Sequence, residues 1–347
     1  KNIFNEELER EWEYLSKISN ISVFQTYNWN KNWVDHIYNK RDLLYILCVY
    51  LDNKIISIIP LLKKKILNIS YLTTIGLPFS DYFDCLLDKK LIKNKMLSRQ
   101  IRDYITNIKN IDLILINNIQ KDSNFFFILN QTDLEPQNYK SYEIQNNKSQ
   151  NPVNKKFEKD TLRQINRISS IGKIDFETYL NYSQKKKLIN SFFKMKMSQL
   201  KKTKNWNYLS KTSNKSFLLS TFLYNVYSNV TCLKINGKII SIHLGYNFRN
   251  KLYYIFPVYD PKYSKFSPGN ILLYYIIKNF FKSDGTSVDL TTGDEKYKLR
   301  ISNKINMIYK LNFSFTRKGN FLIFLIWVKN KLKKNKYIVK VFNKLFY

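Results

Sequence analysis

Residues 289–298 hold a group of ionisable side chains suited to moving protons. The group consists of Asp289, Asp294, Glu295, Tyr297 and Lys298. An alkyl ammonium has a pKa of about 10 and becomes a nucleophile only after losing a proton, so a neighbouring carboxylate can act as its general base. The three carboxylates are therefore candidate bases. Lys298 is a candidate for orienting them or an acidic substrate group.

The segment before this group is suited to holding an anion. Residues 267–270 read Ser-Pro-Gly-Asn and stand where an apolar helical run begins. Ser267 is a natural N-cap, and proline is favoured at the first helical position. With Lys262 and Lys265 in the preceding loop, the free N–H groups and positive dipole end of that helix attract phosphate. An anion cradle facing proton-transfer residues is what acyl transfer from a phosphorylated carrier needs.

Four predicted elements position these two groups. Residues 252–259 predict a strand, the polar loop after them leads into the helix, and residues 287–290 predict a second, short strand. The second strand returns the acidic residues to the end of the unit where the helix starts. Five of the eight glycines lie between 237 and 293. Because glycine concentrates where backbone turns tightly or approaches a ligand, this places the site in the second half of the chain.

The motifs in this order resemble those of the GNAT-type acyltransferases, and more closely the cellulose-biosynthesis-type (CelD/BcsL-like) subgroup. These proteins are relatives of the Fem peptidoglycan aminoacyl transferases. Their C-terminal signature is "spG", an apolar helix and then "D-x-x-x-G-x-x-x-Y-K". The matching residues here are Ser267, Pro268, Gly269, Asp289, Gly293, Tyr297 and Lys298.

Further matches extend the resemblance over about residues 20 to 310. Residues 24–33 are similar to the family's "fq…W…W" segment, and residues 76–82 to its "G…DY" element. Residues 162–167 resemble its arginine-rich helix, with fewer arginines. The resemblance implies that Asp81, Tyr82 and Arg163 line the substrate cleft. His243, in the middle of a predicted strand, has two open interpretations, a structural side chain or a substrate contact.

The resemblance also implies a mechanism in which an amine attacks a thioester directly. It places the donor's phosphates at Lys262, Lys265, Ser267, Gly269 and Asn270. It places the oxyanion donor among the backbone N–H groups of Ile255, Phe256 and Val258, because Pro257 has none. Tyr297 would protonate the leaving thiolate. The implied donor is acyl-CoA or an acyl carrier protein, and the acceptor is the amine of an amino sugar or another precursor of cell-surface polysaccharide.

Composition limits the other classes of function. The chain has 347 residues, 58 Lys and Arg against 26 Asp and Glu, and a net charge of +32. Such a charge attracts polyanions, although a lysine-rich solvated surface explains it equally well. Three scattered cysteines and two histidines predict neither a disulfide framework nor a metal centre, so we expect no metal cofactor and a reducing, cytoplasmic compartment.

The predicted fold is α/β, with tandem GNAT-like (Fem-like) halves, each a mixed, mostly antiparallel sheet flanked by helices. The predicted divisions are 1–140, a catalytic half at 141–318 and a C-terminal helix at 319–347. Tight turns at Asp52-Asn53 and Asn236-Gly237 predict two hairpins, since such dipeptides favour hairpin turns. The segments "NKIISI" and "GKIISI" that follow these turns are a weak internal repeat.

Residues 320–347 alternate apolar side chains with lysines and predict a basic amphipathic helix. One interpretation is peripheral attachment to an anionic membrane on the inner face of the cell membrane, and the other is packing on the protein's own core. The apolar run at 321–328 is about half the length needed to span a bilayer.

Two alternative functions stay open. The first is a Fem-type transferase that uses aminoacyl-tRNA, the one nucleic acid we expect as a partner. The second is a non-catalytic module that binds anions or membranes. We found no compact basic motif of the kind that marks a dedicated nucleic-acid-binding domain.

Overall fold

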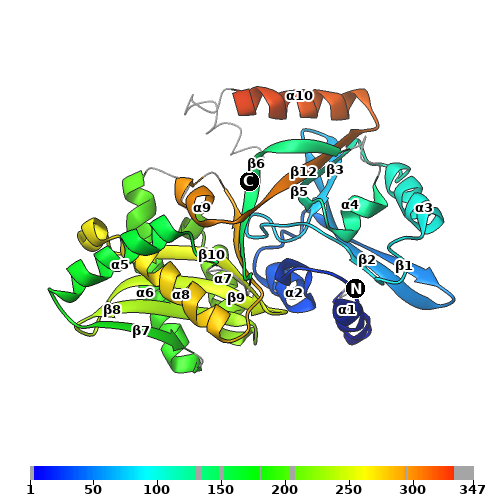
Figure 1. The fold of residues 1–347 in the computed structure, drawn as a ribbon. Helices are drawn as coiled ribbons and strands as arrows, with labels where there is room; N and C mark the ends of the chain where they lie inside the picture. The colour runs from blue at the N-terminus through cyan, green and yellow to red at the C-terminus, as the bar shows by residue number, and fades with distance from the viewer. Residues whose placement is uncertain are drawn as a thin grey trace. The chain divides into compact units, whose positions relative to one another are not determined.

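The structure is a computed structural model, and it describes residues 4–129, 134–147, 152–179, 181–203, 208–293 and 295–331. The chain forms two compact units. Unit 1 contains residues 1–34, 38–138 and 307–347, and unit 2 contains residues 35–37 and 139–306, each as far as described. The chain passes from unit 1 to unit 2 within β6 (Leu134–Gln145) and returns to unit 1 within β12 (Lys304–Ser314) (Figure 1).

Unit 1 is built on a mixed sheet in the order β1-β2-β3-β5-β12, with β4 paired to β2. Only β3 and β5 run parallel among the described pairs of this unit. Its elements are α1 (Glu6–Ile18), η1 (Val23–Gln25), α2 (Tyr27–His36), β1 (Leu43–Leu51), β2 (Lys54–Ile66), β3 (Ile69–Thr74), β4 (Leu86–Leu87), α3 (Lys95–Thr106), β5 (Leu113–Gln120), α4 (Asn124–Ile128), β12 (Lys304–Ser314) and α10 (Arg317–Lys331).

The strands of unit 2 belong to the same mixed sheet and follow in the order β6-β11-β10-β9-β8-β7. Only β10 and β11 run parallel among its described pairs. Its elements are β6 (Leu134–Gln145), α5 (Lys155–Ser169), β7 (Ile174–Tyr179), α6 (Tyr182–Thr203), η3 (Tyr208–Ser210), α7 (Thr212–Tyr224), β8 (Ser228–Ile235), β9 (Lys238–Phe248), β10 (Lys251–Tyr259), η4 (Pro261–Phe266), α8 (Pro268–Lys282), β11 (Ser287–Thr292) and α9 (Lys296–Ile301).

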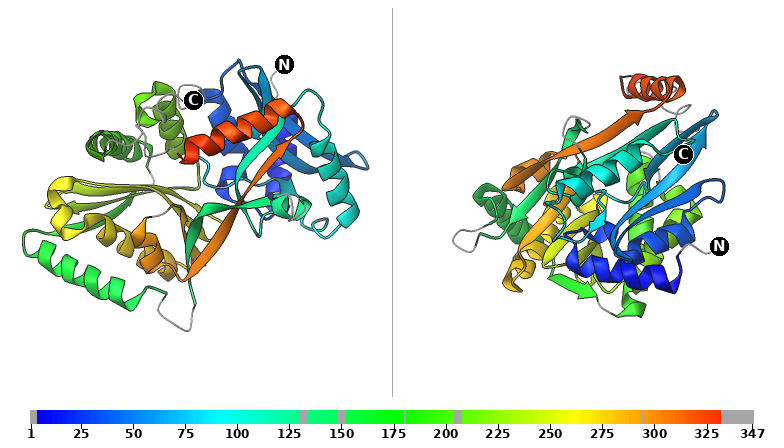
Figure 2. Two further views of the ribbon diagram at one scale, coloured as in Figure 1. Left: turned by 90° about the horizontal axis from the view of Figure 1, so that it is seen from above. Right: turned by 90° about the vertical axis from the view of Figure 1, so that its right-hand side faces the viewer.

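Helices cover both faces of the unit 2 sheet. Helices α5 and α8 lie on one face and α6 and α7 on the other (Figures 1 and 2). The apolar residues of α8 are spread around the helix, and seven of its fifteen residues are buried. They pack with α5 and the sheet in one core that includes Phe157, Leu233 and Leu272. A helix this apolar needs cover on most sides, which explains its place between α5 and the sheet.

The predicted architecture of two α/β halves with mixed, mostly antiparallel sheets is confirmed. Both predicted hairpins form, and residues 52, 53 and 236 adopt the positive φ that such turns require. The described part of the predicted C-terminal helix is α10, which packs on the protein's own core. Strand β12 pairs with β5, and Leu322 of α10 is fully buried against Ile69 and Tyr71 of β3. Residues 332–347 of that predicted helix lie outside the described residues.

A buried carboxylate ties together the strands that will carry the site. Glu143 of β6 is only 5% exposed and forms ion pairs with Lys251 of β10 at 3.0 Å and Lys304 of β12 at 3.2 Å. Burial acts to raise its pKa, but Lys251, a hydrogen bond from Ser287 and Lys304 together lower the pKa of Glu143. These contacts join the first residues of β10 and β11, so they fix the end at which the two strands pair.

We predict that Glu143→Gln lowers the free energy of unfolding by about 1–3 kcal/mol at pH 7, because charged hydrogen bonds are lost from a buried site. The folded-state pKa lies below the unfolded value of about 4.3. The stabilisation is therefore complete above that value and disappears as the pH falls through the folded pKa. Urea denaturation at several pH values measures it.

Glu135→Gln is the matched control. Glu135 pairs with Lys310 at 2.8 Å, but its side chain is 59% exposed. Exposed pairs contribute about 0–1 kcal/mol, so this variant should lose less. Equal losses in the two variants would contradict the anchoring role of Glu143.

Candidate active site

The parallel strands β10 and β11 separate shortly after they begin. They pair at three positions, Lys251 with Ser287, Leu252 with Val288 and Tyr253 with Asp289. Beyond these the described residues of the two strands form no further pairs, although β10 continues to Tyr259. The register of β10 against β9 shifts between Tyr253 and Phe256, and that of β11 against β6 shifts after Asp289. The two strands therefore diverge, and we call the region between them the V. Its closed end, where the strands still pair, lies at Glu143.

A glycine allows the bend in β10. A Cβ on Gly245 of β9 would lie 2.2 Å from the carbonyl oxygen of Tyr253, so any other residue would push β10 away at the shift. A carboxylate fixes the bend in β11. Asp289, 3% exposed, accepts the N–H of Thr291 at 2.8 Å, and Thr291 has a φ of 60°. The observed contact of Asp289 is thus with backbone, and we expect it to shape the turn rather than to take a proton from substrate.

The turn after β11 is organised by a buried lysine. Lys298 is 4% exposed, donates to the carbonyl of Thr292 at 2.6 Å and pairs with Glu295 at 3.1 Å. Gly293 has a φ of 144°. A Cβ there would lie 2.1 Å from Oε2 of Glu295. Lys298 therefore holds the Glu295 carboxylate beside the turn, while Glu295 itself stays exposed. Asp294 lies outside the described residues.

Tyr297 follows directly in α9 and packs against the unit 2 core. Burial, and secondarily the negative charge of Glu295, raise the pKa of Tyr297 well above its ordinary value. The phenol therefore keeps its proton at neutral pH. It remains available as a proton donor to a stronger base that appears beside it.

The separated part of β10 exposes a carbonyl where an N–H was expected. The N–H of Asp260 bonds to the carbonyl of Ile240. Because bonded and non-bonded pairs alternate along an antiparallel ladder, the peptide groups of Val258 and Phe256 face β9, and those of Pro257 and Tyr259 face away from it. Two of the three predicted oxyanion donors thus point to β9. Ile255, in the shifted segment, is the third.

A lysine that sequence reasoning missed lies at that carbonyl. Lys196 of α6 donates to the Pro257 oxygen at 3.1 Å. Burial lowers the pKa of Lys196, and the charge of Glu295 acts in the opposite direction. The signal was present in the sequence, because Phe192 and Leu200 lie four residues to either side and put Lys196 on the buried face of the helix. It was obscured by the many other lysines of α6.

The start of α8 is open, but not as predicted. Ser267 adopts a φ of 52° and its side chain makes no capping hydrogen bond, so the N-cap prediction is wrong in mechanism. Its carbonyl instead accepts the N–H groups of Asn270 and Ile271, at 2.9 and 3.2 Å. A Cβ on Gly269 would meet only the Tyr259 ring, at 3.6 Å. The helix start therefore lies beside the last residue of β10, at the open end of the V.

The two loop lysines are exposed. The backbone N–H of Lys262 bonds to Asp260 at 3.0 Å. The ammonium of Lys265 lies 5.0 Å from the centre of the Phe266 ring. Both remain predicted phosphate contacts, because no observed contact ties either side chain to the start of α8.

Two predicted substrate contacts are in the protein interior. His243 is fully buried and stacks on Tyr254 at 4.3 Å, and burial lowers its pKa to about 3. It is a neutral core side chain, so its predicted substrate contact is wrong in this structure. Tyr82 is 2% exposed and packs on Phe24 in the core of unit 1. Its predicted role is corrected in the same way.

Arg163 and Asp81 remain accessible. The Arg163 side chain is 69% exposed, pairs with Asp160 at 3.5 Å and borders a shallow hollow along α5 with Lys159 and Asn166. Asp81 is partly exposed in unit 1. Nothing observed joins either residue to the V, so both stay predictions.

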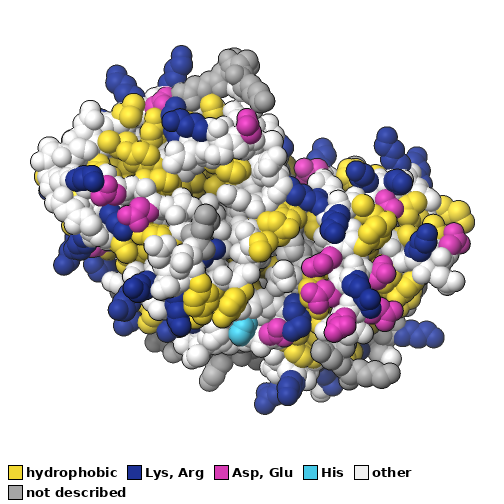
Figure 3. Space-filling model, turned by 90° about the horizontal axis from the view of Figure 1, so that it is seen from below, with side chains coloured by type: hydrophobic (Ala, Val, Ile, Leu, Met, Phe, Trp, Pro, Cys, Tyr) yellow, Lys and Arg dark blue, Asp and Glu magenta, His cyan; other side chains and the backbone are white. Residues whose placement is uncertain are grey.

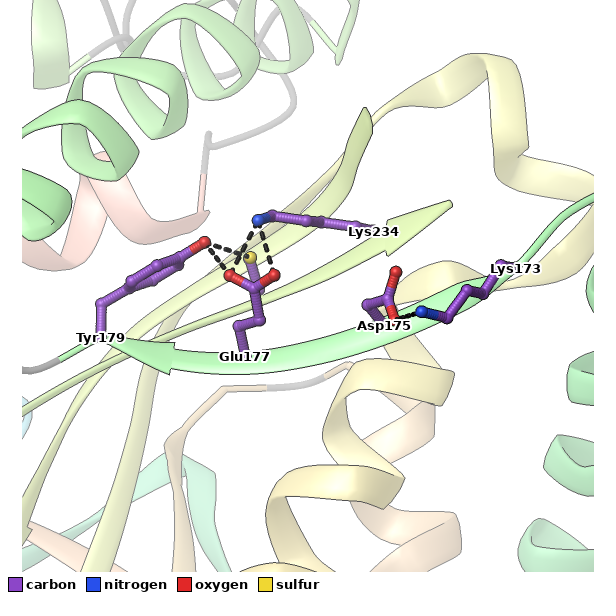
Figure 4. Close-up of polar contacts among 6 residues, drawn as sticks. Lys173, Asp175, Glu177, Tyr179 and Lys234 are labelled. Atoms are coloured by element: carbon purple, nitrogen blue, oxygen red, sulfur yellow. Dashed lines mark hydrogen bonds and ion pairs between the residues drawn. The ribbon is translucent and has the colours of Figure 1, made fainter. Parts of the chain in front are cut away.

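A second ionisable cluster is fully paired. On β7 and β8, Glu177 accepts from Lys234 at 2.7 Å and from Tyr179, and Lys173 pairs with Asp175 at 3.3 Å (Figure 4). Charged pairs on β7, the edge strand of this sheet, hinder pairing with another chain.

Burial raises the pKa of Cys232, which lies beside this cluster, to about 11, so Cys232 is no thiolate nucleophile. Among the described residues, no three His, Cys, Asp or Glu side chains gather to bind a metal.

Comparison with known proteins agrees with this geometry. Residues 155–299 match the family model described as "Acetyltransferase (GNAT) domain". The match includes α5 to β11 and most of α9, and therefore the V and the turn after it. No curated protein matches the sequence.

Several solved structures share the fold over nearly the whole chain. FemX has a TM-score of 0.60 at 11% identity, covering 91% of this chain and 98% of its own. L-PGS from Bacillus licheniformis has a TM-score of 0.54 at 8% identity, covering 91% and 94%. The C-terminal domain of a putative lysylphosphatidylglycerol synthetase from Agrobacterium fabrum has 0.53 at 10%, covering 93% and 96%. At these identities the likeness shows the fold alone.

We predict that Gly293→Ala costs about 1–3 kcal/mol of unfolding free energy, because a φ of 144° is almost closed to other residues. The added methyl group would also displace Glu295 from Lys298. Urea denaturation measures the loss. Gly237→Ala is the control, since Gly237 has a φ of 75° but no atom within 4 Å of its added Cβ. Equal losses would show that the packing around Gly293 has no role.

Proposed function

We propose that this chain, which has the tandem GNAT-type fold and carries a GNAT-type transferase domain, moves an acyl group from acyl-CoA to an amine. The separation of β10 from β11 carries the proposal. Both strands run toward the open end of the V, where the start of α8 and the turn at Gly293 also lie. An elongated thioester fits between strands that end beside a phosphate site and a proton-transfer group.

The donor would bind by its phosphates at the start of α8. Pro268 has no N–H, and the N–H groups of Asn270 and Ile271 bond to the Ser267 carbonyl. The phosphate would therefore approach the N–H of Gly269, which brings no side chain over the helix end. Lys262 and Lys265 would add charge from the loop. The thioester arm would then extend along β10, whose peptide groups at Pro257 and Tyr259 face away from β9.

Lys196 would stabilise the oxyanion. The resemblance implies that a backbone N–H of β10 binds the oxyanion, but Pro257 has a carbonyl and no N–H at this position. The ammonium of Lys196 lies 3.1 Å from that carbonyl oxygen. An ammonium in a partly buried site is a strong donor to a developing negative charge. One such donor contributes about 3 kcal/mol to transition-state stabilisation.

The proton transfers would use the turn after β11. Glu295, held by Lys298, would take a proton from the amine directly or through water, with Asp294 as the untested alternative base. The nitrogen then forms its bond to the acyl carbon, and the carbon–sulfur bond breaks. The thiolate that leaves would take a proton from Tyr297, the donor that the resemblance in sequence implies.

The acceptor assignment depends on the resemblance in sequence alone. It favours an amino sugar or another amine precursor of cell-surface polysaccharide, acylated on the cytoplasmic side. An acyl carrier protein in place of CoA would present the same phosphopantetheine thioester. The cellulose-biosynthesis-type subgroup belongs to this proposal as well.

A Fem-type, aminoacyl-tRNA-dependent transfer is the second candidate, and the net charge of +32 is compatible with it. A polyanionic donor would gain from many lysine–phosphate contacts. Loss of activity on ribonuclease treatment would identify it, whereas a CoA enzyme would be unaffected.

We predict that acyl-CoA raises the melting temperature of the protein, and that Gly269→Glu abolishes the rise. At 100 times its Kd, a ligand adds about 2.7 kcal/mol of stability. A carboxylate at this position suits the helix dipole, so the variant should fold normally while repelling phosphate. Gly269→Ala is the matched control and should keep most of the shift.

Two outcomes would contradict the donor site. The first is that no CoA thioester shifts the melting temperature of the parent protein, which would favour tRNA or a non-catalytic module. Alternatively, Gly269→Glu would show the same shift as the parent, which would place the phosphates elsewhere.

We predict that Lys196→Met lowers kcat about 100-fold with little change in KM, because an oxyanion donor acts mainly in the transition state. Release of free CoA with a panel of amines and amino sugars measures turnover. Lys194→Met, on the exposed side of the same helix, is the control and should be near parental. An unchanged kcat, or an increase in KM alone, would remove Lys196 from this role.

A further inference from the structure

The outer side of α10 carries an exposed aromatic ridge. Phe321, Phe324 and Trp327 are 52%, 55% and 54% exposed, and together we call them the aromatic ridge. They follow one another at three-residue steps, so they lie along one side of the helix. The Phe324 and Trp327 rings stack at 6.1 Å with an angle of 21° between their planes. Three large aromatic side chains in a row on one helix are unusual for a surface that meets only water.

The fold does not need these side chains. Helix α10 is attached to its unit by the opposite side, where Leu322 is fully buried and packs with Ile69, Tyr71 and Leu113. Ile323 and Ile326 pack against the same cluster. Figure 2 shows α10 at the margin of its unit. The aromatic ridge is therefore carried by a helix whose other side is already packed. A helix that only packs on its own unit usually has polar residues on its solvent-facing side, where the aromatic ridge lies.

Positive charges flank the ridge. Arg317 and Lys318 are exposed where α10 begins, and Lys331 is exposed where it ends, its ammonium 5.0 Å from the centre of the Trp327 ring. From residue 317 to the end, the sequence has nine Lys and Arg, and no Asp or Glu follows Glu295. The partner that covers the ridge must therefore combine apolar contact with negative charge.

We propose that the aromatic ridge docks α10 onto an anionic lipid surface, with the helix lying in the plane of the interface. Phe and Trp side chains settle at the boundary between headgroups and acyl chains, and flanking Lys and Arg side chains reach the lipid phosphates. None of the helices among the described residues has the length and apolarity to span a bilayer. Attachment is then by one face of α10, in a manner independent of the proposed chemistry in unit 2.

The charges argue against the other partners. A second copy would bring its own flanking cations against these, with no acidic residue on α10 to pair with them. Stacking of nucleic-acid bases needs aromatic rings set in a groove that follows the backbone, whereas these rings protrude from a helix. Both partners are outcomes of the test below.

Vesicle binding by the full chain tests the proposal. The parent and a Phe321→Ser/Phe324→Ser/Trp327→Ser variant are sedimented with phosphatidylcholine vesicles, with and without phosphatidylglycerol. We expect binding only to the anionic vesicles, weakened by added salt, and about tenfold or more weaker in the variant. Circular dichroism melting checks that the variant is folded.

The matched control changes three equally exposed side chains elsewhere in unit 1. Met96→Ser/Tyr104→Ser/Phe127→Ser removes residues that are 71%, 52% and 50% exposed. This variant should bind anionic vesicles like the parent. Equal weakening in both triple variants, or no binding of the parent to anionic vesicles, would overturn the proposal.

Trp327 also offers a direct signal. Trp12, Trp29 and Trp33 are buried, so they should respond little to lipid. We expect a blue shift of emission when the parent meets anionic vesicles, and its loss in Trp327→Phe, which keeps an aromatic ring and should still bind. A vesicle-bound parent without the shift would overturn the proposal, as would ridge-dependent dimers or ridge-dependent RNA binding without vesicle binding.

Discussion

The parallel contact between β10 and β11, which ends after three residues, is the constraint on which the site depends. A sheet ordinarily satisfies its peptide groups by continuing to pair. Here the pairing is stopped by a register shift in each strand, one permitted by Gly245 and the other held by Asp289. Glu143 keeps the closed end together. The peptide groups left beyond that end are what a bound thioester arm would meet.

Lysines in the interior give this site its electrostatic character. Most of the described Lys and Arg residues are exposed or partly exposed, and in the face shown in Figure 3 they are scattered singly and in small groups among other residues. Lys298 and Lys196 differ from these surface residues, because each is at least partly buried and bonds to defined protein groups. Lys298 holds a carboxylate and a carbonyl of the turn, while Lys196 is bound to one carbonyl of the separated strand. The first fixes the geometry of the turn, and the second would meet the oxyanion in the proposed mechanism.

Local signals in the sequence predicted the fold well and the site less well. Turns such as Asn236-Gly237 and the proline at the start of α8 depend on a few adjacent residues, so they were predictable. Helix α7 was not predicted, because its apolar residues follow no single face. The burial of His243 and the contact of Lys196 with Pro257 depend on strands and helices distant in the sequence. One sequence does not reveal which lysine or carboxylate is desolvated, and desolvation decides its role.

The choice between a nucleotide thioester and a tRNA donor depends on where positive charge is placed, not on how much there is. A net charge of +32 raises the encounter rate with any polyanion and therefore favours neither donor by itself. A tRNA needs a continuous track of cations for its many phosphates. CoA needs only one localised phosphate site leading to one acyl position. The open start of α8, the last residue of β10 and the turn at Gly293 would supply that shorter path within a single unit, which is why we propose a thioester as the donor.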